Sequence, residues 1–312
     1  NRPIGELVKS LQSLGAEIEY LEKEGFPPLK IRGRKLKGGP LKIDSGISSQ
    51  YISAILMIAP LFDEGLQLEL TGDTISSSYI DMTIALMKES GAEVSKQGNQ
   101  IRVSPKPYEQ GTIEVEPDWS SASYWFMIAG LHPESNILLK GLKNQSYQGD
   151  AQITAMFDNL GISSEFNQNG LILRHSEIKM TTFRYDFREN PDMVQSFIPY
   201  CIARDIPFYF SGCRTLRIKE TDRVSALHAE LFKFGVQISF SEDGDMIWWD
   251  GKSKPDWNRD VTIETYKDHR MALGFAPLVI KARNMNIKDP GVVSKSYPNF
   301  WEDLRKAGFS LE

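Results

Sequence analysis

Apolar positions along the chain follow two spacings, the helical period and the two-residue period of a strand. At five places an amphipathic helix, a glycine and a short alternating strand follow one another. These segments are LVKSLQSLGAEIEY, IALMKESGAEVSK, ITAMFDNLGISSEF, ALHAELFKFGVQISF and FWEDLRKAGFSLE, with Gly15, Gly91, Gly161, Gly235 and Gly308. Successive glycines are 76, 70, 74 and 73 residues apart, and this regularity predicts a repeated structural unit.

A second kind of helix also recurs, and it is apolar on nearly every face. Its copies are SSQYISAILMIAPLF at 48–62, SSASYWFMIAGL at 120–131, DMVQSFIPYCIA at 192–203 and DHRMALGFAPLVI at 268–280. A helix of this composition is enclosed by protein. Short alternating runs between the helices predict strands at 66–72, 99–104, 136–141, 170–175, 208–212 and 245–251. One unit therefore contains a strand, a buried helix, a second strand, an amphipathic helix and a hairpin.

Four such units follow a partial one, which predicts an α/β protein with its helices packed inside and its sheets outside. The loop SPKPYEQG at 104–111 ends shortly before a new unit begins at Val115. We therefore expect two domains, 1–114 and 115–312, joined by a hinge of a few residues. Such a joint suits a ligand cleft.

Composition narrows the possible partners. The net charge of -5 argues against a general nucleic-acid binder, so a basic cluster would serve a small anionic ligand. The longest apolar run, 52–62, is shorter than the roughly 20 residues that cross a bilayer. Cys201 and Cys213 indicate neither a disulfide framework nor a zinc site, which favours a reducing compartment. Because the chain begins with NRPIGELV, already helical in pattern and without Met, we expect that an N-terminal portion is missing.

Polar residues stand at the start of every apolar helix. They are Ser48, Ser49 and Gln50, then Asp118, Ser120 and Ser121, then Asp192 and Gln195, and finally Asp268, His269 and Arg270. N-capping, at about 1 kcal/mol per cap, explains the set at 118–121 best. At 48–50 the alternative is an anion site built from hydroxyls and backbone N–H groups. Asp192 leaves both readings open, a simple cap or a functional carboxylate.

Cations at helix starts oppose the helix dipole and require a counter-charge. Arg217, Lys219 and Arg223 stand before or at the start of a predicted helix, and Arg270 begins another, with its neighbour Asp268 as a candidate partner. Lys295 precedes a third helix. An alternative interpretation of Glu220 beside Lys219 is a surface ion pair that contributes little stability. The four histidines show no metal-ligand spacing, so we expect no metal.

Six segments occur in order: RPIG at 2–5, SSQ at 48–50, YIDMT at 79–83, RIKETDR at 217–223, DHRMA at 268–272 and KSYPNFW at 295–301. Together they resemble the 5-enolpyruvylshikimate-3-phosphate synthase family over essentially the whole chain. KETDR with DHRMA is specific, whereas RPIG or SSQ alone is weak. The resemblance implies a two-domain inside-out α/β barrel of six βαβαββ units that closes over its substrates. About two of these units would be absent from the N-terminus.

The family's members transfer the enolpyruvyl group of phosphoenolpyruvate to the 5-hydroxyl of shikimate 3-phosphate and release phosphate, in the shikimate pathway to chorismate and aromatic amino acids. The resemblance therefore implies a cytoplasmic transferase, a monomer without metal or organic cofactor, that binds two small anionic substrates. It implies neither nucleic acid nor membrane as a partner. The cations at 217–223 would hold substrate charge.

Motif by motif, the resemblance also implies roles for residues. Asp192 would be the proton acceptor near the attacking hydroxyl, and Glu220 and Lys295 would transfer protons at the methylene carbon and the departing phosphate. Shikimate 3-phosphate would be bound by Ser48, Ser49, Gln50, Ser76, Tyr79 and Lys219. Gln50 would also reach phosphoenolpyruvate, which Arg223 and Arg270 would clamp through its carboxylate and phosphate.

The chain departs from the family pattern at several places. Ser77 and Ser78 replace a Lys-Pro pair, and Thr215 replaces an Asn, so the local loop and one substrate hydrogen bond are in doubt. The family's early Lys-Ser and Arg and its Asn-Ala-Gly loop have no counterpart here. We therefore expect little or no turnover unless the missing part is supplied.

Two rival functions remain. One is a related enolpyruvyl transferase that acts on a UDP-sugar. This function is disfavoured by the KETDR segment, by its pairing with DHRMA and by the lack of a Cys in a suitable loop. The other is a non-catalytic homologue that uses the same fold for binding, which the joint presence of the charged residues disfavours.

Overall fold

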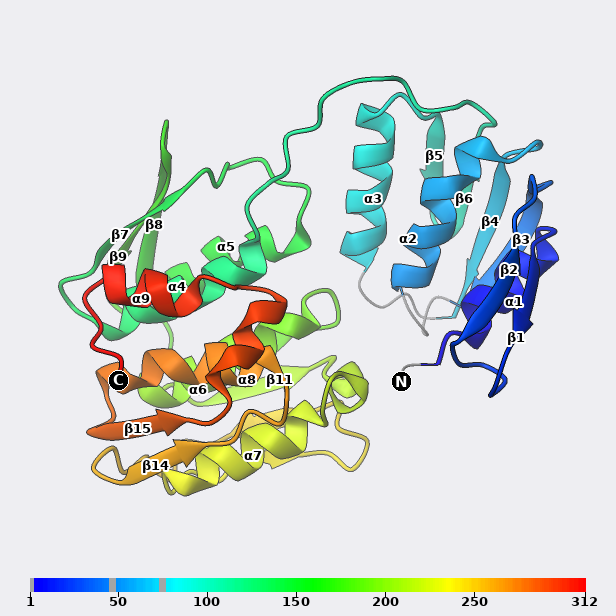
Figure 1. Cartoon of the computed structure of the whole chain (residues 1–312). Coiled ribbons are helices and arrows are strands. Elements are labelled where there is room, and N and C mark those ends of the chain that lie inside the picture. The colour runs from blue at the N-terminus through cyan, green and yellow to red at the C-terminus, as the bar shows by residue number, and fades with distance from the viewer. Residues whose placement is uncertain (1–2, 45–48, 73–76) are drawn as a thin grey trace. The chain divides into compact units, whose positions relative to one another are not determined.

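The computed structural model describes residues 3–44, 49–72 and 77–312 of the chain, and Figure 1 shows its helices and strands. The chain folds into two compact units. Unit 1 is Asn1–Val115 with Tyr147–Gly149, and unit 2 is Glu116–Ser146 with Asp150–Glu312. The predicted division into domains 1–114 and 115–312, joined by a hinge, stays a prediction.

Unit 1 contains a partial repeat followed by a complete one. The partial repeat is α1 (Gly5–Ser13), β1 (Glu17–Tyr20) and β2 (Leu29–Arg32). The complete repeat is β3 (Gly39–Asp44), α2 (Ser49–Ile58) with a 3-10 turn at Ala59–Leu61, β4 (Leu66–Thr71), α3 (Ser77–Glu89), β5 (Val94–Gln97) and β6 (Gln100–Val103). Its sheet has the order β3-β4-β6-β5, in which β3 and β4 are parallel and the other pairs antiparallel.

Unit 2 contains three further repeats. The first is α4 (Trp119–Leu131), β7 (Asn136–Lys140), α5 (Ile153–Asn159), β8 (Ile162–Asn167) and β9 (Gly170–His175). The second is β10 (Phe183–Asp186), a 3-10 turn at Pro191–Met193, α6 (Val194–Ala203), β11 (Phe208–Ser211), α7 (Arg223–Lys233), β12 (Ser239–Phe240) and β13 (Ile247–Trp249). The third is β14 (Asp260–Ile263), α8 (His269–Phe275), β15 (Asn284–Ile287) and α9 (Phe300–Lys306).

The sheets of unit 2 repeat the arrangement of unit 1. The order β10-β11-β13-β12 matches that of the complete repeat in unit 1, again with one parallel pair, and β14 and β15 are also parallel. The predicted α/β class and its βαβαββ unit are therefore confirmed, and each predicted strand at 66–72, 99–104, 136–141, 170–175, 208–212 and 245–251 contains an observed one.

The apolar helices of unit 2 form its core, as predicted. Only Ser121 of α4 and Ala203 of α6 are not buried, and all of α8 is buried. The prediction of an enclosed helix is wrong for α2, where Met57 and Leu61 of the following turn are 50% and 57% exposed. Within unit 1, the helices that contact α2 are α1 and α3.

The strand expected at the start of the repeat that contains α4 is absent. Residues 104–118 contain no strand. Pro105, Pro107 and Pro117 lie in this segment, and proline cannot donate a ladder hydrogen bond. The repeat that contains α4 therefore has the three-stranded sheet β7-β9-β8.

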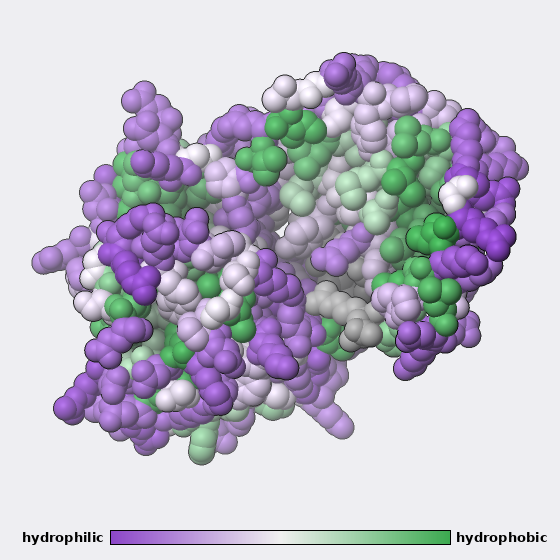
Figure 2. Space-filling model, viewed as in Figure 1, coloured by the Kyte–Doolittle hydropathy of each residue, from purple (hydrophilic) through white to green (hydrophobic). Residues whose placement is uncertain are grey.

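The two units also differ in surface and in composition. In Figure 2 the visible face of unit 2 is mostly hydrophilic, whereas hydrophobic residues gather on that of unit 1. All six tryptophans, Trp119, Trp125, Trp248, Trp249, Trp257 and Trp301, lie in unit 2. The longest helices of the described residues, α3 and α4, have 13 residues, and none in that part of the chain is long and apolar enough to cross a membrane.

Close contact between α6 and α8 fixes the position of the α8 N-terminus, and it depends on Gly274. A Cβ built on Gly274 would overlap the carbonyl oxygen of Gln195 in α6. Alanine normally stabilises a helix interior relative to glycine by about 1 kcal/mol. We expect Gly274→Ala to destabilise the fold instead, and to lower the free energy of unfolding by about 1–3 kcal/mol, as measured by urea denaturation.

Gly291→Ala is the matched control, because its Cβ would meet nothing within 4 Å. We expect this substitution to change the free energy of unfolding by less than about 0.5 kcal/mol. Equal stabilities for the two variants would contradict the close packing of α8 on α6.

Candidate active site

Arg270 connects three buried helices of unit 2. Arg270, in the first turn of α8, places Nη1 3.4 Å from the Tyr124 hydroxyl of α4. Its Nη2 donates to Asp192 Oδ2 at 3.2 Å, in the 3-10 turn that leads into α6. A single guanidinium therefore connects the start of α8 to α4 and to the turn that leads into α6.

Arg223, the first residue of α7, lies at the centre of the charged residues. Its side chain is only 2% exposed, and its guanidinium donates to three carboxylates. Nε donates to Asp268 Oδ2 at 2.7 Å, Nη1 to Asp192 Oδ1 at 2.8 Å, and Nη2 to Glu220 Oε2 at 3.0 Å. Because a buried guanidinium needs compensating charge, this side chain fixes all three carboxylates relative to one another.

Two lysines complete the group. The Lys219 ammonium lies 3.4 Å from Asp192 Oδ1, and Lys295 donates to Glu220 Oε1. The Lys295 side chain is 54% exposed, so it is the most accessible cation of the four. The charged cluster, as we call it, thus consists of Lys219, Arg223, Arg270, Lys295, Asp192, Glu220 and Asp268.

Two sequence-based pairings and one capping assignment are wrong. The Arg270 guanidinium pairs with Asp192 and not with its neighbour Asp268, which accepts from Arg223 instead. Glu220 does not pair with Lys219 at the surface, because the Glu220 carboxylate faces Arg223 and Lys295. Asp192 is not a helix cap, since it lies within a 3-10 turn and accepts from side chains.

The capping predictions for two other carboxylates hold. Asp118 accepts from the backbone N–H of Ser120 at the start of α4. Asp268 accepts from the backbone N–H of Arg270 at the start of α8. Both residues therefore cap a buried helix in the same way.

Ionisation in the cluster follows from the competition between burial and neighbouring charge. Burial alone would raise the pKa of Asp192, but the charges of Arg270, Lys219 and Arg223 outweigh it and hold that pKa far below its usual range. Burial and the charge of Arg270 lower the pKa of His269 to about 4, so its imidazole is neutral at pH 7. His269 therefore adds no positive charge beside the cluster at neutral pH.

Glu220 makes the stability of the chain depend on pH. Burial would raise its pKa, but the hydrogen bond from Lys295 and the charge of Arg223 lower it to about 2. A carboxyl whose pKa is lowered in the folded state stabilises the fold above its ordinary pKa and loses that effect as the pH falls toward the folded value. We therefore expect the free energy of unfolding to decrease between about pH 4.5 and about pH 2.

Urea denaturation of the chain and of Glu220→Gln across this range measures the contribution of Glu220. The difference in stability between the two proteins should be largest above pH 4.5 and should shrink at lower pH. A difference that does not change with pH would show that the Glu220 carboxylate is not stabilised by Lys295 and Arg223.

The other predicted site residues belong to unit 1, and the described ones begin its two main helices. Ser49 and Gln50 start α2, and Tyr79 stands in the first turn of α3. The strands before these helices, β3 and β4, are parallel, so both helices begin at the same edge of the sheet. Ser53 of α2 and Thr83 of α3 are hydrogen-bonded at 2.8 Å, so the helices pack together. Ser48 and Ser76 lie outside the described residues.

Two buried residues near the cluster were missed by the sequence analysis. Tyr124, whose hydroxyl contacts Arg270, reads as an ordinary core aromatic of α4. Asp150 is buried and accepts from Ser120 and from Asn190 Nδ2, and burial raises its pKa. No periodicity or motif in the sequence pointed to the Asp150 carboxyl.

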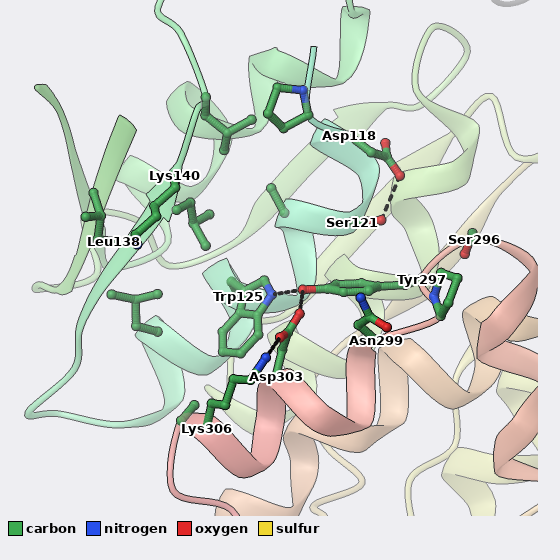
Figure 3. A pocket seen from close by; sticks show the side chains of 17 residues that line it. Asp118, Ser121, Trp125, Leu138, Lys140, Ser296, Tyr297, Asn299, Asp303 and Lys306 are labelled. Atoms are coloured by element: carbon green, nitrogen blue, oxygen red, sulfur yellow. Dashed lines mark hydrogen bonds and ion pairs between the residues drawn. The ribbon is translucent and has the colours of Figure 1, made fainter. Parts of the chain in front are cut away.

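A groove of about 670 Å³ lies beside the cluster but does not include it. Figure 3 shows its walls, in which Trp125 Nε1 donates to the Tyr297 hydroxyl, which in turn donates to Asp303. Lys140 and Leu138 of β7 line another side. None of the predicted site residues is among those that line this groove.

Comparison with known proteins identifies the family. The family model described as EPSP synthase (3-phosphoshikimate 1-carboxyvinyltransferase) matches residues 1–304. A 3-phosphoshikimate 1-carboxyvinyltransferase of Bacteroides fragilis is 46% identical over the whole chain and 76% of its own length. The chain belongs to the EPSP synthase family. A 3-phosphoshikimate 1-carboxyvinyltransferase of Photobacterium damsela subsp. piscicida is 35% identical over 98% of the chain and 70% of its own length.

Solved structures support the fold of an EPSP synthase. One EPSP synthase from Acinetobacter baumannii matches all of the chain and 72% of its own with a TM-score of 0.76 at 23% identity. The enolpyruvyl transferase NikO from Streptomyces tendae covers 99% of the chain with a TM-score of 0.73 at 12% identity. The predicted two-domain α/β fold and the membership of the EPSP synthase family are thus confirmed, and the chain is a transferase by family.

Proposed function

We propose that the charged cluster of unit 2 carries the enolpyruvyl transfer of the EPSP synthase family, with phosphoenolpyruvate and shikimate 3-phosphate as the substrates. The observation that supports this proposal is the convergence of Lys219, Arg223, Arg270 and Lys295 on three carboxylates at the tips of buried helices. Four cations against three carboxylates leave net positive charge for an anionic ligand. Proton donors and acceptors lie in the same group.

The two arginines would bind phosphoenolpyruvate by different means. The hydrogen bonds from the Arg270 guanidinium to Tyr124 and Asp192 are 3.2–3.4 Å long, so the bond to Asp192 can be exchanged for one to a ligand oxygen at modest cost. Arg223 makes one shorter hydrogen bond, of 2.7–3.0 Å, to each of three carboxylates, and its burial makes it the fixed member of the pair. Planar guanidinium donors match the carboxylate and the phosphate of phosphoenolpyruvate.

Addition is the first chemical step. Asp192 would accept the proton of the 5-hydroxyl of shikimate 3-phosphate, whose oxygen forms a bond to C2 of phosphoenolpyruvate while C3 gains a proton. Lys219 beside Asp192 would orient the shikimate ring. Addition to an enol phosphate requires this division between a base at oxygen, here Asp192, and an acid at carbon, here Glu220 in its protonated form.

Elimination is the second step. The C2–O bond to phosphate breaks, phosphate leaves with the proton that Lys295 supplies, and C3 loses a proton to Glu220. The C2–C3 double bond is thereby restored, and the product is an enol ether. Glu220 is ionised at neutral pH because of Lys295 and Arg223. A ligand that draws Lys295 away would raise the pKa of Glu220 and so prepare it to act as the acid in the addition.

The helix starts of unit 1 would hold the other substrate. Ser48, Ser49 and Gln50 at α2, with Ser76 and Tyr79 at α3, would supply hydroxyls, an amide and backbone N–H groups for the phosphate of shikimate 3-phosphate. The parallel order of β3 and β4, which sets both helix starts at one edge, supports this assignment. The proposal includes a monomer in the cytoplasm. The buried free thiols of Cys201 and Cys213 support a reducing compartment.

Isothermal titration calorimetry tests the proposal on the chain as it is. We expect shikimate 3-phosphate to bind and phosphoenolpyruvate to bind more tightly when shikimate 3-phosphate is present. Phosphate release in the same mixture measures turnover. Binding of a UDP-sugar in place of shikimate 3-phosphate, or of none of these ligands, would overturn the proposed function.

A further inference from the structure

Asp268 is the member of the charged cluster to which no step of the proposed reaction assigns a role. Its side chain is fully buried, unlike those of Asp192 and Glu220. It stands immediately before α8, between the loop after β14 and the first turn of the helix. A carboxylate that is inaccessible to ligands acts through the groups it contacts.

Its contacts are to both arginines of the cluster. Oδ2 accepts from Arg223 Nε at 2.7 Å, and Oδ1 accepts from Arg223 Nη2 at 3.3 Å, so the carboxylate holds the guanidinium by two parallel bonds. The same Oδ1 accepts from the backbone N–H of Arg270 at 2.9 Å. One side chain therefore fixes the plane of one guanidinium and the backbone from which the other extends.

The loop that delivers Asp268 is itself held in an unusual conformation. Tyr266 and Lys267 have φ angles of 53° and 59°, which non-glycine residues rarely adopt in succession. Buried Glu230 of α7 holds this loop, because it accepts from the Tyr266 hydroxyl at 2.7 Å and from the backbone N–H of Glu264 at 3.0 Å. Helix α7 thus contacts the loop through Glu230 and contacts Asp268 through Arg223.

We propose that Asp268 is a positioning residue that orients Arg223 and Arg270 together for the carboxylate and phosphate of phosphoenolpyruvate. This inference rests on the proposed function and deepens it. For a variant without the Asp268 carboxylate, it predicts a change in phosphoenolpyruvate affinity opposite to the one that net charge alone predicts. Removing a carboxylate makes the cluster more positive, which by Coulomb attraction would strengthen the binding of an anion. Loss of orientation weakens that binding.

Asp268→Asn separates the two effects, because asparagine is an equally good helix cap and has nearly the same shape. We expect the variant to bind phosphoenolpyruvate at least about tenfold more weakly than the unchanged chain in the presence of saturating shikimate 3-phosphate. Its affinity for shikimate 3-phosphate alone should change less than about threefold. Calorimetry gives both affinities.

Asp118→Asn is the matched control. Asp118 caps α4 with the same geometry, and its carboxylate accepts from Ser120 and Ser121 without contacting the cluster's arginines. We expect this variant to bind phosphoenolpyruvate within about threefold of the unchanged chain. Equal or tighter binding by Asp268→Asn, or the same loss in both variants, would overturn the inference.

A measurement on the unchanged chain keeps the inference testable if Asp268→Asn fails to fold. In an NMR spectrum of chain labelled with 15N-arginine, the Nε–H of Arg223, which donates to Asp268, should exchange slowly with water both before and after phosphoenolpyruvate binds. Rapid exchange of this proton would contradict a fixed guanidinium. If the unchanged chain binds neither substrate, the proposed function itself fails. If the unchanged chain binds both substrates and Asp268→Asn binds them equally well, only the inference about Asp268 fails.

Discussion

Replacing Arg223 with methionine is expected to lower the free energy of unfolding by about 3–5 kcal/mol, the largest effect on stability that the structure predicts for a single charged residue. The guanidinium is buried against Asp192, Glu220 and Asp268. Asp192 keeps Arg270 and Lys219 as partners, and Glu220 keeps Lys295. Asp268 would keep only uncharged donors and a neutral His269, so its buried carboxylate would remain uncompensated.

Urea denaturation at pH 7 measures this effect, and Arg214→Met is its control. Arg214 pairs with Asp243 at 2.8 Å, but its side chain is 68% exposed. Exposed pairs contribute about 0–1 kcal/mol, so the control should remain close to the unchanged chain. A loss for Arg223→Met no larger than that of the control would show that the three carboxylates do not depend on this guanidinium.

Replacing Arg270 with leucine is expected to weaken phosphoenolpyruvate binding by about 100-fold, with shikimate 3-phosphate present. The expectation follows from the loss of charge-assisted hydrogen bonds, each of which contributes about 1.5–3 kcal/mol. The fold should persist, because Arg223 and Lys219 still compensate Asp192. Leucine also retains the apolar part of a side chain that is 10% exposed.

Calorimetry measures the affinity for each substrate in Arg270→Leu and in the control Arg188→Leu. Arg188 forms an exposed pair with Asp186 and contacts no member of the cluster. The control should bind both substrates as the unchanged chain does, and Arg270→Leu should bind shikimate 3-phosphate nearly normally. Undiminished phosphoenolpyruvate binding by Arg270→Leu would exclude this arginine from the donor site.

The repeated elements were predictable because burial leaves a local pattern in the sequence. Segment 192–203 is apolar on all faces, and α6 is accordingly enclosed. The α2 segment has the same pattern but is only partly covered, because coverage depends on which elements pack nearby and not on the helix itself. The missing strand before α4 has a different origin, because alternation at 112–116 favours a strand while neighbouring prolines limit its pairing.

For the site, the sequence indicated which residues carry charge but not which residues they contact. Arg223 and Asp268 are 45 positions apart, and Asp192 and Arg270 are 78 apart, so only the tertiary packing of α6, α7 and α8 brings them together. Adjacency along the chain suggested Asp268 for Arg270 and Lys219 for Glu220. Both suggestions failed because a helix start directs neighbouring side chains to different sides.

The confinement of all tryptophans to unit 2 gives the molecule a built-in optical reporter. Indole emission arises from unit 2 alone, whereas far-ultraviolet circular dichroism registers the helices of both units. Coincident transitions in the two signals would mean that the units denature as one cooperative body. Separate transitions would assign to each unit its own melting event without any added label.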